Sequence, residues 1–130
     1  MLKRCIWALA VLLVASVWAV SLAAFPPANG HVTGMGLAAS PPNYNGHCPA
    51  TIHFNGWVRA SGPMAMEGSF DRSDGARGGP VRLHFGGAGQ QRISDTWSLG
   101  SPGQNVNGWE QFGSGNMRTN RAMFHVHCSK

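Results

Sequence analysis

The segments CPATIHF at positions 48–54 and AMFHVHC at positions 122–128 decide the fold of this chain. In both segments apolar and polar side chains alternate, and the cysteine, Cys48 or Cys128, falls in the apolar row. Successive side chains of a β-strand point to opposite faces, so this alternation predicts two strands that are each buried on one face. The two sulfur atoms are therefore expected to face a common interior, where they can pair.

The N-terminus has the pattern of a secretory signal peptide. Lys3 and Arg4 precede an apolar run that ends in Ser21-Leu22-Ala23-Ala24. Small residues at positions 21 and 23 fit cleavage after Ala23 or Ala24, which predicts a signal helix over residues 1–24. The run is long for a signal peptide, and a retained membrane anchor is the alternative.

The rest of the chain is expected to form a linker and one domain. Two prolines and Asn-Gly mark residues 25–30 as a linker, and residues 31–130 are enough for a single domain. Cleavage removes Cys5 and leaves Cys48 and Cys128, and an even pair in a secreted or periplasmic protein predicts a disulfide. The two positions are 80 apart, so loop entropy predicts about 4–5 kcal/mol of stabilisation.

Short alternating segments separated by Gly, Pro and Asn run through the whole domain, and no segment after the leader has helical periodicity. We expect about seven strands, over residues 31–39, 48–60, 64–70, 80–85, 92–99, 109–112 and 121–128. This pattern predicts an all-β fold, a single antiparallel immunoglobulin-like sandwich. Asn55-Gly56 is compatible with a hairpin or with a bulge inside a longer strand that reaches Ala60, and we favour the longer strand.

Several sequence pieces together resemble a family of small exported bacterial domains with immunoglobulin-like sandwich character, most of them uncharacterised. The pieces are Asn43-Tyr44-Asn45-Gly46, Cys48 to Phe54, Gly62-Pro63, Arg72 to Ala76, Ser94 to Gly100, Gly108-Trp109 and Asn120 to Cys128. The resemblance spans residues 31–130 and departs from the family pattern between Phe112 and Asn120. It implies the fold and an exported location, and it supplies no catalytic residues.

Composition argues against two classes of function. Loss of Lys3 and Arg4 with the leader lowers the formal net charge from +5 to +3, carried by scattered arginines. Such scatter indicates a solvated surface or a weak attraction to acidic envelope polymers or lipids, and it lacks the basic stripe of a nucleic-acid-binding protein. The chain has only five carboxylates, and none is arranged as an acid–base pair, so we expect no enzymatic activity and no cofactor.

Two pairs of residues are candidate metal ligands. His125 and His127 project from one face of the last strand, and Met64 and Met66 have the same spacing. Imidazole and thioether groups suit copper, and imidazole alone suits zinc. The competing interpretation places the histidines on the surface and the methionines in the core.

Trp57 and Trp109 each follow Asn-Gly and are candidate exposed anchors for a sugar or a protein partner, although ordinary packing is the favoured interpretation. The leading hypothesis is an exported, non-enzymatic structural or interaction module. Its partner is unknown, with an envelope polymer or another exported protein as options, and no membrane contact is expected after leader cleavage. The alternatives are a periplasmic copper- or zinc-binding protein and a carbohydrate-binding module.

Overall fold

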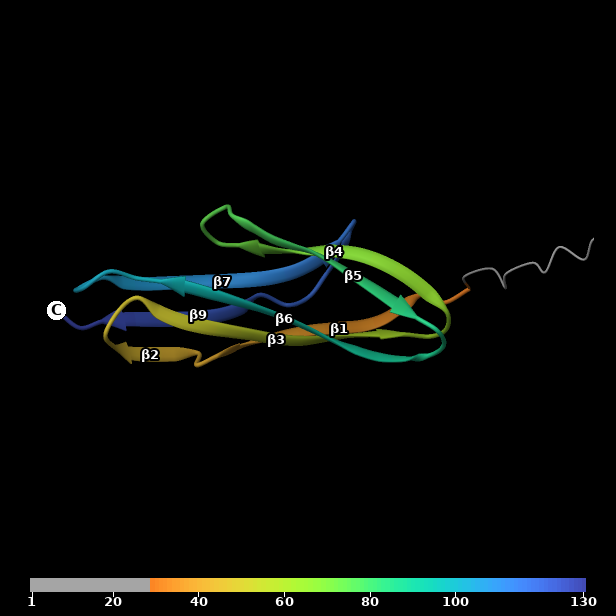
Figure 1. Cartoon of the computed structure of the whole chain (residues 1–130), viewed down its shortest axis with the longest axis horizontal. Helices are drawn as coiled ribbons and strands as arrows, with labels where there is room; N and C mark the ends of the chain where they lie inside the picture. Colours follow the sequence, from red (N-terminus) through yellow and green to blue (C-terminus); the bar gives the residue numbers. More distant parts are fainter. Residues whose placement is uncertain (1–28) are drawn as a thin grey trace, which may run out of the picture.

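Alternating apolar rows bring nine strands into two packed sheets in the computed structural model, which describes residues 29–130 (Figure 1). The strands are β1 (Val32–Ser40), β2 (Asn43–Gly46), β3 (Ala50–Ala60), β4 (Met64–Arg72), β5 (Arg77–Phe85), β6 (Gly89–Leu99), β7 (Asn105–Ser114), β8 (Met117–Arg118) and β9 (Ala122–Cys128). The first described residues and the C-terminus lie at opposite ends of the long axis. The expected signal peptide falls outside the described residues, as does most of the expected linker.

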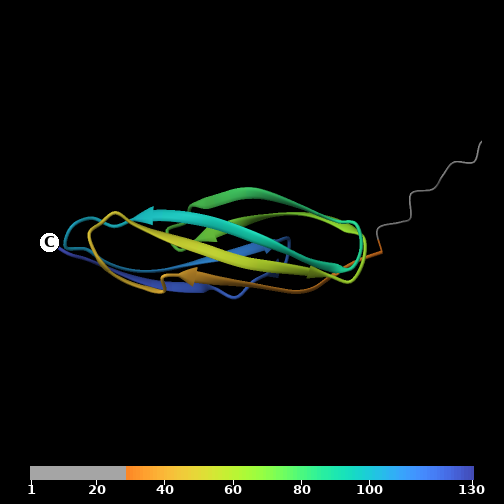
Figure 2. The ribbon, with the colours of Figure 1, turned by 60° about the horizontal axis from the view of Figure 1, so that its bottom comes forward.

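The smaller sheet has the order β1-β3-β6, and the larger sheet has the order β2-β9-β7-β4-β5, with β8 paired to β7. Figure 2 shows β1, β3 and β6 side by side. All pairings are antiparallel except that of β2 with β9, which is parallel. Strands β1, β3 and β6 correspond to strands A, B and E of immunoglobulin domains, and β9, β7, β4 and β5 correspond to strands G, F, C and C′, with β2 as an additional edge strand. The predicted all-β sandwich is confirmed.

Aromatic side chains from both sheets meet in the core. Phe54 of β3 and Trp97 of β6 each pack edge to face on Phe124 of β9, with ring centroids 5.7 and 5.3 Å apart. Phe70 and Phe112 pack within the larger sheet, with centroids 5.0 Å apart. Edge-to-face and offset pairs add to the free energy gained by burying apolar area, so the contacts of Phe54 and Trp97 with Phe124 tie the two layers together.

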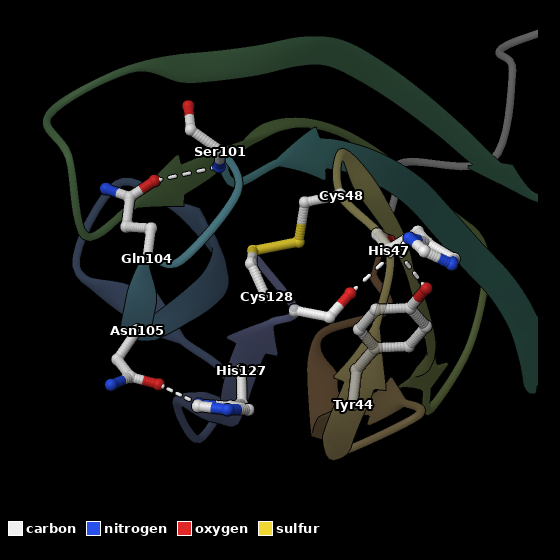
Figure 3. Close-up of a disulfide and its surroundings, with 9 residues drawn as sticks. Tyr44, His47, Cys48, Ser101, Gln104, Asn105, His127 and Cys128 are labelled. Carbon is white, nitrogen blue, oxygen red and sulfur yellow. Dashed lines mark hydrogen bonds between the residues drawn. A yellow bond between two sulfur atoms is a disulfide. The ribbon is translucent and has the colours of Figure 1, made fainter.

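The predicted disulfide is present and joins the two sheets at one end of the sandwich (Figure 3). Cys48 lies just before β3, Cys128 ends β9, and their Cα atoms are 5.5 Å apart. Gly100 follows β6 at the same end with a φ of +98°, in the left-handed region that favours glycine. The disulfide therefore closes the interior where three strands of different sheets converge.

The strand predictions were incomplete in three places. No strand was expected between residues 39 and 48, yet Asn43–Gly46 forms β2, because four successive residues pair with β9. The strand expected over residues 109–112 extends to Asn105–Ser114, since long-range pairing with β9 and β4 satisfies its backbone groups. The short strand β8, which pairs with β7, was not expected either. With β2 and β8, residues 29–130 form nine strands where about seven were expected.

The longer strand through Asn55-Gly56 is confirmed, without a hairpin or a bulge at that point. Gly56 is required for another reason: a Cβ there would lie 2.3 Å from the carbonyl oxygen of Gly36. Close approach of β1 to β3 therefore explains this glycine. Within residues 29–130, no helix has the length and apolar character needed to span a membrane.

Candidate functional site

The outward rows of β3 and β6 form a polar ladder on the outer face of the three-stranded sheet. The register pairs Thr51 with Ser98, His53 with Thr96, Asn55 with Ser94, Trp57 with Arg92 and Arg59 with Gln90. Hydroxyl groups of Thr51 and Ser98 share a hydrogen bond of 2.9 Å, and Arg59 Nη2 donates one of 2.9 Å to Gln90 Oε1. Cross-strand pairing therefore fixes the positions of these side chains.

Trp57 is the one large aromatic side chain in this ladder, and it lies against two glycines of β1. A Cβ added to Gly36 would lie 2.9 Å from Trp57 Nε1, and one added to Gly34 would lie 3.1 Å from a ring carbon. Any larger residue at these positions would displace the indole. Gly34 and Gly36 of β1 therefore leave the space against which the outward-facing Trp57 ring packs.

Arginines and small polar groups surround the ring. The Arg59 guanidinium lies 5.3 Å from the Trp57 ring centroid, and Arg92 is the cross-strand partner of Trp57. A groove runs beside the ring, and its lining includes Asn55, Gln90 and Ser94. We call Asn55, Trp57, Arg59, Gln90, Arg92 and Ser94 the Trp57 face.

Negative charge lies elsewhere in the described residues. On the larger sheet Glu67 pairs with Arg82 at 3.0 Å, and Asp71 pairs with Arg77 at 3.0 Å and with Arg118 at 2.8 Å. Among residues 29–130, no salt bridge involves Arg59 or Arg92. The Trp57 face therefore carries uncompensated positive charge.

Trp109 lies on the outer face of the larger sheet, and it differs from Trp57 in one respect. The Arg121 guanidinium sits 4.1 Å from its ring centroid, closer than Arg59 is to Trp57. Its cross-strand neighbour is Met123, whose side chain is 62% exposed. Both rings have a guanidinium over them, but Arg121 stacks more closely on Trp109 than Arg59 does on Trp57, so Trp109 is the poorer platform for a ligand.

The candidate metal ligands fall into two separate groups. His125 and His127 lie on β9 and point outward, whereas Met64 and Met66 of β4 pack against the core. Strand β7 lies between β9 and β4 in the sheet. The structure thus does not bring the methionines to the histidines, and the part of the chain that it describes holds no group of three or more His, Cys, Asp or Glu side chains suited to a metal.

Each of the two histidines has a fixed ring orientation. Nδ1 of His125 bonds to Oδ1 of Asn107, and Nδ1 of His127 bonds to Oδ1 of Asn105 (Figure 3 shows the second pair). An amide oxygen can only accept, so Nδ1 carries the proton and Nε2 of the neutral ring keeps its lone pair.

A cluster that sequence reasoning missed lies between the sheets, where Arg72 meets two carboxyl groups. Arg72 Nη2 is 3.1 Å from Asp95 Oδ2, and Arg72 Nε is 3.6 Å from Oε1 of Glu110, which is fully buried. Among the described residues, neither oxygen of Glu110 has a hydrogen-bond partner. Glu110 shares the inward row of Phe112, and this shared parity was the available signal.

Burial sets the protonation of this cluster. Burial raises the pKa of Glu110 to about 8, and the neighbouring Asp95 adds to this shift. Arg72 acts in the opposite direction but does not cancel it. Burial alone would raise the pKa of Asp95, but interactions with Glu110, the Thr96 backbone and Arg72 lower it below 3.8. The pair therefore holds one proton on Glu110 at neutral pH, which avoids a second buried charge.

No protein-family model matches the sequence, and no curated protein matches it either. One solved structure with similarity is a β-glucosidase from Listeria innocua in complex with gluconolactone, at 10% identity and a TM-score of 0.41. The match covers 75% of this chain and spans 16% of that one. Likeness at this level carries no argument about function.

Proposed function

We propose that this chain is an exported, non-enzymatic interaction module that binds carbohydrate through the Trp57 face. The observation that carries the proposal is the packing of Trp57 against Gly34 and Gly36. This packing holds the indole ring on the outer face of the sheet, beside a polar groove. An indole face stacks on the apolar face of a sugar ring, while neighbouring amides and hydroxyls bond to its hydroxyl groups.

A protein partner fits this surface less well. Protein interfaces bury a central cluster of aromatic and apolar anchors, whereas the Trp57 face has one aromatic side chain amid Asn55, Gln90 and Ser94. Export is supported by the Cys48–Cys128 disulfide, since such bonds persist in oxidising compartments.

The test is binding to a panel of soluble polysaccharides by affinity electrophoresis and calorimetry. Trp57→Ala should abolish binding to every polysaccharide that the wild type binds, and Trp109→Ala should leave it intact. Both variants should keep the wild-type circular dichroism spectrum. Loss of binding in Trp109→Ala alone, or no binding to any polysaccharide, would refute the proposal.

A second candidate function is copper or zinc binding at His125 and His127, without Met64 and Met66. The Nδ1 hydrogen bonds to Asn107 and Asn105 favour it, because protein imidazole ligands usually donate their other ring N–H to an oxygen. Calorimetric titration should show stoichiometric binding that is lost in the His125→Ala/His127→Ala double variant. His53→Ala, on the other sheet, is the control, and absence of binding in the wild type rules this function out.

A further inference from the structure

We infer that the ligand of the Trp57 face is an acidic polysaccharide, whose carboxylate or sulfate groups pair with Arg59 and Arg92. The inference rests on the proposed carbohydrate-binding function and adds the charge of the ligand to it. Its basis is the separation of charge between the two outer faces of the sandwich.

The arginines of the domain fall into two sets. Arg72, Arg77, Arg82 and Arg118 each lie within 3.6 Å of a carboxylate oxygen. Arg59 and Arg92, by contrast, are on the face that lacks carboxylates: the strands β1, β3 and β6 contain a single acid, Asp95, which points between the sheets toward Arg72. Arg121 also lies outside these pairs, and it stacks on Trp109 of the larger sheet. Two of the three arginines without a salt bridge among residues 29–130 therefore flank Trp57, where their positive potential complements an anion.

The positions of the two arginines suit a ligand stacked on Trp57. Arg92 stands directly across from Trp57 in the register, and Arg59 follows two residues later on the same face of β3. The two arginines are therefore diagonal neighbours, about 7–8 Å apart at the strand level. Acidic groups on a sugar held over the indole come within reach of both guanidinium groups, which bond to carboxylates and sulfates as forks.

Neutral groups complete the recognition surface. Asn55 and Ser94 form one cross-strand pair beside the ring, and Gln90 already accepts a hydrogen bond from Arg59. These side chains provide donors and acceptors for sugar hydroxyls next to the two charges. Nucleic acid is a poorer match, because two arginines and one aromatic ring do not make the extended basic stripe that a phosphate backbone needs.

The experiment uses two matched pairs of polysaccharides, polygalacturonate with its fully methyl-esterified form, and dextran sulfate with dextran. Within each pair the sugar backbone is the same and the charge differs, and the two pairs distinguish carboxylate from sulfate. In low salt, we expect the wild type to bind at least one charged polysaccharide about tenfold more tightly than its neutral partner, as hydrogen bonds to charged groups imply. Added NaCl should reduce this preference.

Two double variants with equal charge changes separate local recognition from net charge. Arg59→Gln/Arg92→Gln should remove the preference for the charged polymer, whereas Arg77→Gln/Arg82→Gln should retain it, since Arg77 and Arg82 are exposed but already paired with Asp71 and Glu67. Equal losses in the two double variants would overturn the inference, because binding would then follow net charge alone.

Further outcomes distinguish this inference from the proposed function. Equal, Trp57-dependent binding to charged and neutral partners would overturn the inference and leave carbohydrate binding in place. Absence of any Trp57-dependent polysaccharide binding would overturn both. Tighter binding to phosphatidylglycerol vesicles than to every acidic polysaccharide would indicate that the Trp57 face binds a membrane surface, and it would contradict the inference.

Discussion

The α-carbon of Gly100 packs directly against the sulfur of Cys128: a Cβ added to Gly100 would lie 2.6 Å from Cys128 Sγ and 2.9 Å from Cys48 Sγ. Gly100 also has a φ of +98°. The residue is thus fixed both by its backbone conformation and by the bond that joins the two sheets.

Gly100→Ala should therefore destabilise the protein by more than the backbone effect alone, which is about 1–3 kcal/mol. Gly103→Ala is a matched control, because Gly103 has a φ of +81° in the same loop and its added Cβ would contact only Lys130 at 3.6 Å. The free energies of unfolding, measured in urea, should fall further for Gly100→Ala. Equal losses would show that the disulfide tolerates the methyl group.

Reduction of the Cys48–Cys128 disulfide should lower the free energy of unfolding by about 4–5 kcal/mol, because it frees a loop with a sequence separation of 80 residues in the unfolded chain. Urea titrations with and without reductant measure the change. In the Cys48→Ala/Cys128→Ala double variant, the unfolding curve should not respond to reductant. An unchanged wild-type curve would be inconsistent with a stabilising role for the bond.

Glu110 should make the protein less stable as pH rises toward 8. Its pKa is raised from 4.5 to about 8 on folding, so between these values the folded state keeps a proton that the unfolded state releases. The free energy of unfolding then falls with increasing pH, with a slope of up to ~1.4 kcal/mol per pH unit. The pKa of Asp95 is lowered on folding, so ionised Asp95 stabilises the folded state at neutral pH. This stabilisation is lost as the pH falls below 3.8.

Glutamine has nearly the same shape as a protonated glutamate and does not titrate. In Glu110→Gln the free energy of unfolding should therefore change little between pH 5 and 8, and it should exceed the wild-type value most clearly near pH 8. Glu67→Gln, at an exposed ion pair with Arg82, should retain the wild-type slope. Urea titrations at a series of pH values test this. A wild-type slope in Glu110→Gln would assign the pH dependence to another group.

Gly36→Ala should weaken polysaccharide binding while the fold persists, because the new Cβ lies 2.9 Å from Trp57 Nε1 and displaces a side chain at the surface. Gly86→Ala is the control, since a Cβ there meets nothing within 4 Å. Calorimetry measures affinity, and thermal melting confirms folding. Wild-type affinity in Gly36→Ala would mean that the position of the indole does not matter.

The alternating rows predicted much of the architecture because local periodicity reports which side chains face the core. Cys48 and Cys128 could be paired on this basis, and the longer strand through Gly56 could be favoured. By contrast, β2 was missed because the turn residues at positions 41–46 conceal a parallel pairing with β9. That pairing joins segments far apart in the sequence, so no local pattern reveals it.

The candidate site was only partly predictable for the same reason. Trp57 and Trp109 could both be named, but the difference between them depends on register, which places Gly36 beneath Trp57 and brings Arg121 over Trp109. Arg59 and Arg92 have no carboxylate partner because the fold places the acidic side chains on other strands or between the sheets. The sequence shows seven arginines after the leader, and only the fold separates the four that pair with carboxylates from Arg59, Arg92 and Arg121, which do not.

The most direct measurement is a titration of the ¹⁵N-labelled protein with an acidic oligosaccharide derived from the tightest-binding polymer, followed by amide chemical shifts. The account predicts that the perturbed amides cluster at residues 55–59 and 90–94, together with the indole N–H of Trp57. A cluster at residues 105–109 and 121–127 instead, around Trp109 and His125, would contradict it.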